Sequence, residues 1–106
     1  MEEVKINQNA GEEKATNFAG LTLERTAELM LSGDYRERMT AEWGQCKIRL
    51  EKLKKLLEDE KIGKLGFELT CPITLLREQA LVMQEYVDIL EKRAELEDIR
   101  LYEYFK

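Results

Sequence analysis

Two long segments of the chain carry apolar residues at alternating spacings of four and three, and this pattern constrains the fold more than any other feature. In the segment Tyr35–Lys61 the stripe consists of Met39, Trp43, Cys46, Leu50, Leu53 and Leu57. In the segment Pro72–Ile99 it consists of Ile73, Leu76, Ala80, Met83, Val87, Leu90 and Ala94. Such spacing places each set on one face of an α-helix. The sequence therefore predicts two amphipathic helices of roughly 25 residues, each about 40 Å long.

The stretch between these helices is short and contains residues that end helices. Gly63 and Gly66 supply a C-cap and a hinge, and the residue before Pro72 is kept out of the α region. Pro72 itself suits the first turn of a helix. We therefore expect a long antiparallel helical hairpin, preceded by a short helix over about 22–31 that Thr22 caps.

The expected organisation is a single all-α domain over residues 21–106, with helices over about 22–31, 35–61 and 72–98. Residues 1–20 contain few large apolar residues and many Glu, Asn, Lys and Gly, which is typical of a flexible N-terminal tail. A core built from the remaining residues is of marginal size, and oligomerisation is a common remedy. The fold is therefore expected to assemble as a helical homo-oligomer.

A second row runs beside the main stripe of the second long helix. It consists of Leu75, Gln79, Val82, Tyr86, Ile89 and Arg93. The two rows together form an apolar arc wider than one helical partner needs, so the short helix or another subunit is expected to cover it. Gln79 and Arg93 are either polar groups aimed into an interface pocket or boundary residues with apolar stems. The aromatic C-terminal segment 96–106 is expected to pack on a neighbouring helix or subunit.

Charge is distributed unevenly along an acidic chain. The net charge of −5 disfavours a protein that binds a nucleic-acid polymer. Within 45–55, however, five cations surround a single acid: Lys47, Arg49, Lys52, Lys54 and Lys55 against Glu51. This basic segment is either a site for a small anionic ligand or a solvated helix face with i,i+4 ion pairs. Lys52 and Lys55 are three residues apart and share a face. Trp43, Tyr35 and Tyr86 could stack on a base, although the place of Trp43 on the apolar stripe favours packing in the core.

The sequence offers little for catalysis or for binding a metal. The chain has no histidine, so a histidine relay and an imidazole ligand are both excluded. Cys46 and Cys71 do not form a CxxC motif, and we expect both to be free thiols in a reducing cytoplasm. No stretch approaches 18 apolar residues, and no signal-peptide pattern opens the chain. We expect a cytoplasmic protein that is not an enzyme and uses no cofactor, metal or membrane.

From Tyr35 onward the sequence resembles a family of small phage and prophage proteins named from a crAss-like phage. The resemblance rests on DYRERMTAEWGQCKIRLEKLKKLLE and CPITLLREQALVMQEYVDILEKRAELEDI. More distantly, the chain is similar to the phage anti-CBASS cyclic-nucleotide sponges. The positions that carry this second resemblance read Arg38, Met39, Glu42, Lys52, Leu53, Gln79, Met83, Tyr86, Leu90 and Arg93.

The resemblance to the sponges implies a small helical protein that assembles as a hexamer. Such proteins hold cyclic di- and trinucleotides made by bacterial immune cyclases, without cleaving them, in pockets between protomers. The phosphate-binding lysine of the family falls on Lys52, and its trinucleotide-contacting arginine falls on Arg93. Both residue types are good phosphate partners. Lys54, Lys55 and Tyr35 are further candidates for ligand binding.

Two positions depart from the pattern of the sponges. Their base-stacking aromatic falls on Glu37, and the nearby Tyr35 lies about 200° away around a helix. Their small hydroxyl residue falls on Lys54, which adds charge to the site. The ligand options therefore include another cyclic nucleotide or an ADP-ribose-type signal, in the cytoplasm of a bacterial host. The alternative function is a helical interaction module that binds a host or phage protein through the second apolar row and the aromatic C-terminus.

Overall fold

A computed structural model describes residues 20–106, and this part of the chain is all-helical with no strand. Helix α1 spans Leu23–Met30, α2 spans Tyr35–Lys61 and α3 spans Ile73–Leu96. A 3-10 helix, η1, follows at Leu101–Phe105. The helical fold class thus agrees with the sequence pattern. The tail expected over residues 1–20 lies, apart from Gly20, outside the described residues.

Helices α1 and α2 begin at residues whose side chains cap them. The hydroxyl of Thr22 accepts a hydrogen bond from the backbone N–H of Arg25 at 3.1 Å. The carboxylate of Asp34 accepts one from the N–H of Arg36 at 2.9 Å. Asp34 and Glu37 have the spacing of a capping box, but the N–H of Asp34 donates instead to the hydroxyl of Ser32. Each cap satisfies a donor that the first helical turn leaves unpaired.

The ends of α2 and α3 each carry a residue with positive φ. Gly63 follows α2 with φ of 74°, a conformation that glycine adopts without a steric penalty. Asp98 follows α3 with φ of 57°, and the N–H of Ile99 then bonds the carbonyl of Ala94 at 2.8 Å. The chain therefore leaves the helix at Leu96, two residues earlier than the boundary of 98 expected from the sequence.

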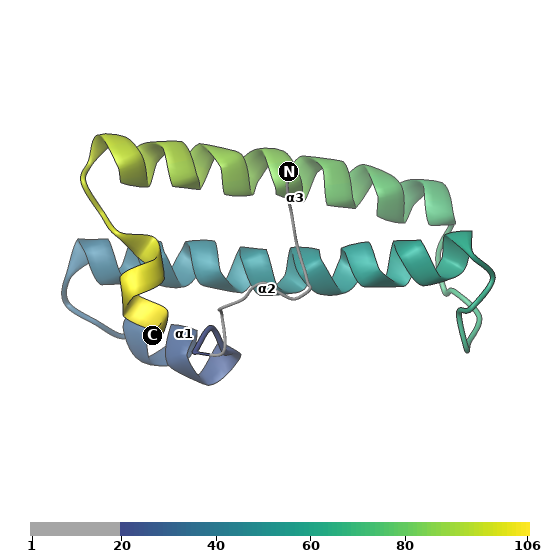
Figure 1. Ribbon diagram of the computed structural model, residues 1–106, viewed down its shortest axis with the longest axis horizontal. Coiled ribbons are helices and arrows are strands. Elements are labelled where there is room, and N and C mark those ends of the chain that lie inside the picture. The colour runs from purple at the N-terminus through teal and green to yellow at the C-terminus, as the bar shows by residue number, and fades with distance from the viewer. Residues whose placement is uncertain (1–19) are drawn as a thin grey trace.

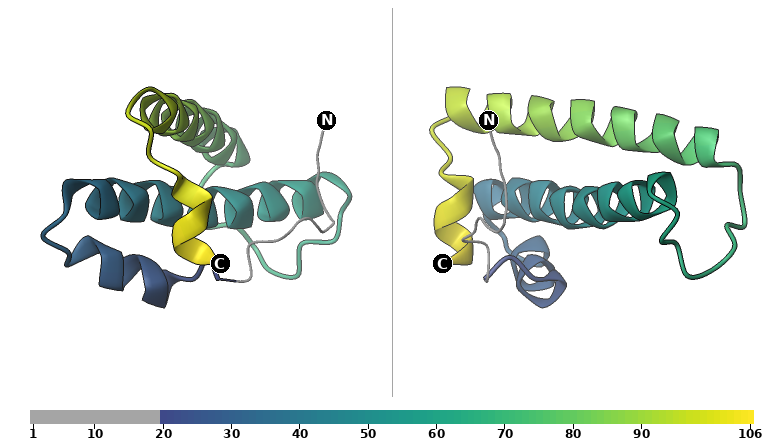
Figure 2. Two further views of the ribbon diagram at one scale, coloured as in Figure 1. Left: turned by 60° about the vertical axis from the view of Figure 1, so that its left-hand side comes forward. Right: turned by 45° about the vertical axis from the view of Figure 1, so that its right-hand side comes forward.

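Helices α2 and α3 lie side by side over most of their length (Figure 1), with α1 on the other side of α2. The contacts between α2 and α3 run in opposite order along the two helices. The indole N–H of Trp43 donates to Glu91, and Glu60 pairs with Arg77 near the other end. In the two rotated views (Figure 2) η1 descends from the end of α3 and crosses the first half of α2.

The core lies where α1, α3 and η1 meet the first half of α2, and Trp43 is its largest fully buried side chain. The ring of Trp43 lies edge-on to that of Tyr102, with centroids 5.1 Å apart, and 5.9 Å from that of Phe105. Phe105 is itself buried. The aromatic C-terminal segment therefore packs on α2 of its own chain, the first of the two alternatives that the sequence left open.

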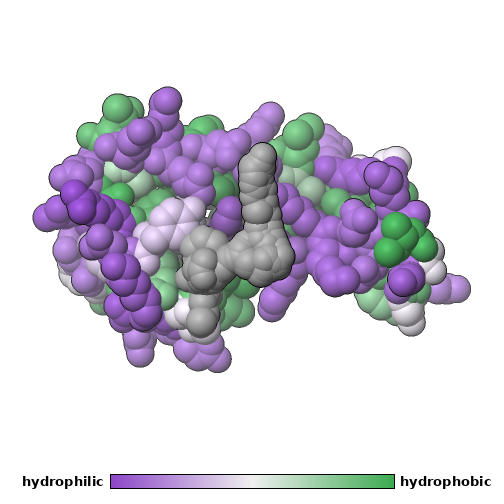
Figure 3. Space-filling view, in the orientation of Figure 1, coloured by the Kyte–Doolittle hydropathy of each residue, from purple (hydrophilic) through white to green (hydrophobic). Residues whose placement is uncertain are grey.

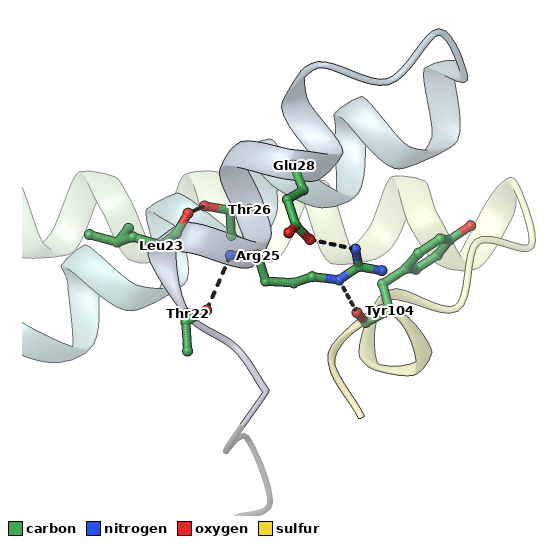
Figure 4. A network of polar contacts seen from close by, with 6 residues as sticks. All are labelled: Thr22, Leu23, Arg25, Thr26, Glu28 and Tyr104. Atoms are coloured by element: carbon green, nitrogen blue, oxygen red, sulfur yellow. Dashed lines mark hydrogen bonds and ion pairs between the residues drawn. The ribbon is translucent and has the colours of Figure 1, made fainter.

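One polar network joins α1 to the C-terminal segment (Figure 4). The guanidinium of Arg25 donates through Nε to the carbonyl of Tyr104 at 3.1 Å and pairs through Nη1 with Glu28 at 3.0 Å. The hydroxyl of the buried Thr26 donates to the carbonyl of Leu23 at 2.7 Å. These contacts connect residues near the two ends of the described chain.

Among the described helices, none is long and apolar enough to cross a membrane.

Candidate functional site

Three side chains form a compact polar cluster where the start of α2 meets the end of α3. The hydroxyl of Tyr35 donates to Glu97 Oε1 at 2.7 Å and accepts from Arg93 Nη2 at 2.6 Å. Arg93 Nε lies 3.4 Å from Glu97 Oε2. Arg93 and Glu97 are one helical turn apart along the chain, so both can reach the same phenol. The structure therefore brings together two of the residues that the sequence selected, Tyr35 and Arg93, and adds Glu97.

The cluster shifts the titration of its members. The pKa of Tyr35 is raised, chiefly because the phenol O–H donates to the carboxylate of Glu97, and the charge of Arg93 opposes that effect. The pKa of Arg93 is raised, chiefly by its interaction with Tyr35 and further by the charge of Glu97, while desolvation acts against them. All three side chains remain solvent-accessible. The guanidinium is therefore a stable cation that solvent, or an anionic ligand, can reach.

The three candidate lysines of α2 differ in how they are paired. Lys54 lies 3.6 Å from the carboxylate of Glu51, and Lys55 lies 2.8 Å from that of Asp59. Lys52 is exposed and forms no hydrogen bond or ion pair with any residue that the structure describes. The basic segment is thus partly the solvated, ion-paired face that the charge pattern allowed. Lys52 is the lysine of the three whose charge is not already compensated.

Lys52 and Arg93 do not meet within one chain. The guanidinium of Arg93 contacts Tyr35 at the start of α2. Lys52 lies on the same helix about 25 Å further along its axis, at 1.5 Å per residue. A single phosphate group cannot contact both side chains of one protomer.

The described surface contains a basic hollow that includes one candidate residue. It has a volume of about 400 Å³ and is lined by Lys54, Leu57, Glu58, Lys61 and Arg77. Lys61 and Arg77 were not selected from the sequence. The spacing of seven between Lys54 and Lys61 would have placed them on one face of α2, but Arg77 comes from α3 and no local signal indicates it.

Three positions named in the comparison with the sponges, Glu37, Arg38 and Gln79, lie within the local structure of α2 and α3. Glu37 is half-buried in the first turn of α2. Arg38 donates to the carbonyl of Ser32 at 2.9 Å and so ties α2 to the preceding turn. Gln79 contacts the sulfur of Met83 one turn along α3 at 3.6 Å.

No group of three or more potential metal ligands occurs in the part of the chain that the structure describes.

A protein-family model described as Sequestin matches residues 33–96 of the chain. The matched region begins just before α2 and ends with the last residue of α3, so it includes Tyr35, Lys52 and Arg93. No curated protein sequence and no solved structure matches the chain.

Proposed function

Because the chain belongs to the Sequestin family, we propose that it acts by sequestering a small anionic ligand. The proposed ligand is a cyclic di- or trinucleotide immune signal, or a related ADP-ribose-type signal, in the cytoplasm of a bacterial host during phage infection. One observation supports this proposal most. The family match spans both α2 and α3, the two helices that carry Lys52 and Arg93. The name of the family itself indicates a sequestering role.

The proposed mechanism is stoichiometric capture without cleavage. Lysine and arginine side chains are the usual partners of phosphate oxygens, and a planar guanidinium can also stack on a base. Lys52 is available to such a ligand because it has no ion pair in the described part of the chain. Arg93 has to exchange the carboxylate of Glu97 for a phosphate, while the phenol of Tyr35 can keep it in place.

The separation of the two cations indicates where the ligand would lie. About 25 Å of helix axis separates Lys52 from Tyr35, the residue that Arg93 contacts. If both cations contact one ligand phosphate, they have to come from different copies of the chain. We therefore place the ligand between protomers of a homo-oligomer, and the resemblance to the sponges makes a hexamer the expected assembly.

The test is a binding panel followed by recovery of the ligand. The purified protein is titrated calorimetrically with cyclic di- and trinucleotides and with ADP-ribose-type signals, and the bound fraction is released by heat denaturation. Tight binding with chemically intact ligand supports sequestration. Altered ligand would indicate an enzyme, and the absence of binding across the panel would overturn the proposal.

A second function, a helical module that binds a host or phage protein, is favoured by the apolar side chains exposed on α3. Leu75, Val82 and Ile89 are each more than half exposed. This alternative predicts a protein partner and no nucleotide affinity. The binding panel distinguishes it from sequestration, because a protein-binding module would leave every nucleotide free.

A further inference from the structure

Helix α3 exposes a row of large apolar side chains at intervals of seven residues. Leu75, Val82 and Ile89 are 55%, 56% and 57% exposed, and Leu96 at the end of the helix is 79% exposed. Large apolar residues at this spacing lie along one line of a helix. Figure 3 shows hydrophobic surface at several places along the upper edge of the molecule, where α3 lies.

A second set of residues interleaves with this row. Gln79, Tyr86 and Arg93 follow Leu75, Val82 and Ile89 by four residues and precede the next apolar residue by three. Alternation of four and three is the pattern of a coiled-coil seam. We define the α3 seam as these seven residues, Leu75, Gln79, Val82, Tyr86, Ile89, Arg93 and Leu96. It continues for almost the full length of α3, about 36 Å.

Apart from the contact of Arg93 with Tyr35 at the start of α2, no described element of the same chain lies on the α3 seam. The stripe that packs against α2 contains Val87, Leu90 and Ala94, which are buried and lie about 100° around the helix from Tyr86, Ile89 and Arg93. The described helices α1 and η1 lie against α2 instead. A helix with an apolar arc on a second face normally buries that face against another helix.

We propose that the occupant of the α3 seam is the α3 seam of a second copy, running antiparallel. The charges beside the seam favour this occupant over another partner. Lys92 and Glu85 precede Arg93 and Tyr86, so they flank the seam, and neither forms an ion pair within the described chain. An antiparallel register places Lys92 opposite Glu85 of the partner subunit, and the two-fold axis repeats this pair.

The same register fills the seam with complementary side chains. It sets Tyr86 against Ile89 of the partner subunit, Arg93 against Val82 of the partner subunit and Gln79 against Leu96 of the partner subunit. A parallel arrangement would instead place Arg93 against its own copy, and two guanidinium groups repel each other. An antiparallel register shifted by one heptad toward the N-terminus would place Glu85 against its own copy, and the two carboxylates would repel each other. Of the three arrangements, the charges therefore favour the antiparallel one that sets Lys92 opposite Glu85 of the partner subunit.

The pairing needs no nucleotide, and it adds a residue to the surroundings of Arg93. Val82 of the partner subunit would cover part of the arginine stem beside the Tyr35–Arg93–Glu97 cluster. The association is thus a property of the chain alone. It can be present even where nucleotide binding fails, so the two proposals are tested separately.

The experiment is a charge exchange across the α3 seam, read out as molar mass by light scattering or sedimentation over a range of concentrations. In Lys92→Glu both flanking positions are acidic, and in Glu85→Lys both are basic. We expect each single variant to raise the dissociation constant of the complex at least tenfold. An equimolar mixture of the two is expected to recover association as a heterodimer, because each acidic position then faces a basic one.

A pair of apolar variants provides the control. Leu81 is 62% exposed but lies outside the α3 seam, so Leu81→Asn is expected to leave the molar mass unchanged. Val82→Asn is expected to weaken association at least tenfold. A monomeric wild-type protein, or two single variants that fail to associate when mixed, would overturn the proposal. If the protein associates only after residues 1–19 are removed, those residues would be the occupant of the α3 seam in the full chain. That result would also overturn the proposal.

Discussion

The hydroxyl of Tyr35 lies 2.6 Å from the guanidinium of Arg93, so the first residue of α2 contacts a cation near the end of α3. Glu97 completes the cluster by accepting from the phenol. A tyrosine that both donates and accepts fixes the position of the guanidinium relative to α2. The cluster therefore links the packing of the two long helices to the residue proposed to contact the ligand.

The first prediction concerns the orientation of Arg93. Tyr35→Phe removes one hydrogen bond to the guanidinium and leaves the ring in place. Because the cluster is exposed and solvent can replace the lost hydrogen bond, we expect the free energy of unfolding to be almost unchanged. Nucleotide affinity is expected to fall about tenfold, because the guanidinium is no longer held by Tyr35. Calorimetric titration beside a Tyr104→Phe control measures this change, and equal affinities for the two variants would contradict the role given to Tyr35.

The second prediction compares two lysines on the same helix. Lys52 has no ion pair in the described chain, whereas Lys55 is 2.8 Å from Asp59. We expect Lys52→Ala to weaken binding of the captured nucleotide at least tenfold, because a charged hydrogen bond to phosphate is lost. Lys55→Ala is expected to cost less than about threefold, since only a surface ion pair of small value is removed. If Lys55→Ala proved the more damaging, the assignment of Lys52 would be wrong.

The third prediction concerns the close approach of Gly44 to α1 and to the C-terminal segment. A Cβ atom at this position would lie 2.9 Å from Thr26 Cγ2 and 3.1 Å from Phe105 Cζ. In an open helix, alanine would stabilise by about 1 kcal/mol over glycine. Here we expect Gly44→Ala to lower the free energy of unfolding by about 1–3 kcal/mol, because the overpacked site has to shift.

Gly33 is the matched control for Gly44, because an added Cβ there meets nothing within 4 Å. Gly33→Ala is expected to be neutral or to stabilise by up to about 1 kcal/mol. Urea unfolding of both variants supplies the comparison. A neutral Gly44→Ala would show that α1 and the C-terminal segment do not pack on α2 as tightly as described.

The fourth prediction is that Tyr102 ionises at a higher pH than an ordinary tyrosine. Desolvation, with a smaller effect of Glu91, raises the pKa of Tyr102 from 10.0 to about 12. Because the pKa is higher in the folded state, folding favours the neutral phenol. Its contribution to the free energy of unfolding is complete below about pH 10 and is lost as the pH rises toward about 12. Phenolate absorbance should show a late step that Tyr102→Phe removes. Titration of all four tyrosines together near pH 10 would contradict it.

Local pattern was sufficient to predict helical structure but not the contacts between elements. The stripes through Trp43 and Val87 depend only on spacing along the chain, and the caps at Thr22 and Asp34 depend on residues two or three positions away. The helix η1 was not predicted. It is held by the packing of Phe105 on Trp43, which are more than 60 residues apart in sequence.

The candidate site shows the same division. Lys52 and Arg93 were selected through a resemblance, and the ion pair of Lys55 with Asp59 follows from their spacing of four. The pairing of Tyr35 with Arg93 could not be predicted from the sequence. Helical geometry places Tyr35 relative to other residues of α2, whereas Arg93 lies on α3. The spacing of four between Arg93 and Glu97 is a local signal for their ion pair that was not used. The contact of Glu97 with Tyr35 becomes visible only when α2 and α3 have been placed side by side.

The most direct measurement of the proposed sequestration is the binding stoichiometry and affinity of Arg93→Ala for the nucleotide captured by the wild-type protein. Arg100→Ala is the control, since Arg100 is an exposed arginine outside the cluster. Molar mass is recorded on the same samples. We expect Arg93→Ala to lose binding at least a hundredfold even at protein concentrations where its molar mass equals that of the wild-type protein, while Arg100→Ala binds normally and releases intact ligand. Unchanged affinity in Arg93→Ala would contradict the account.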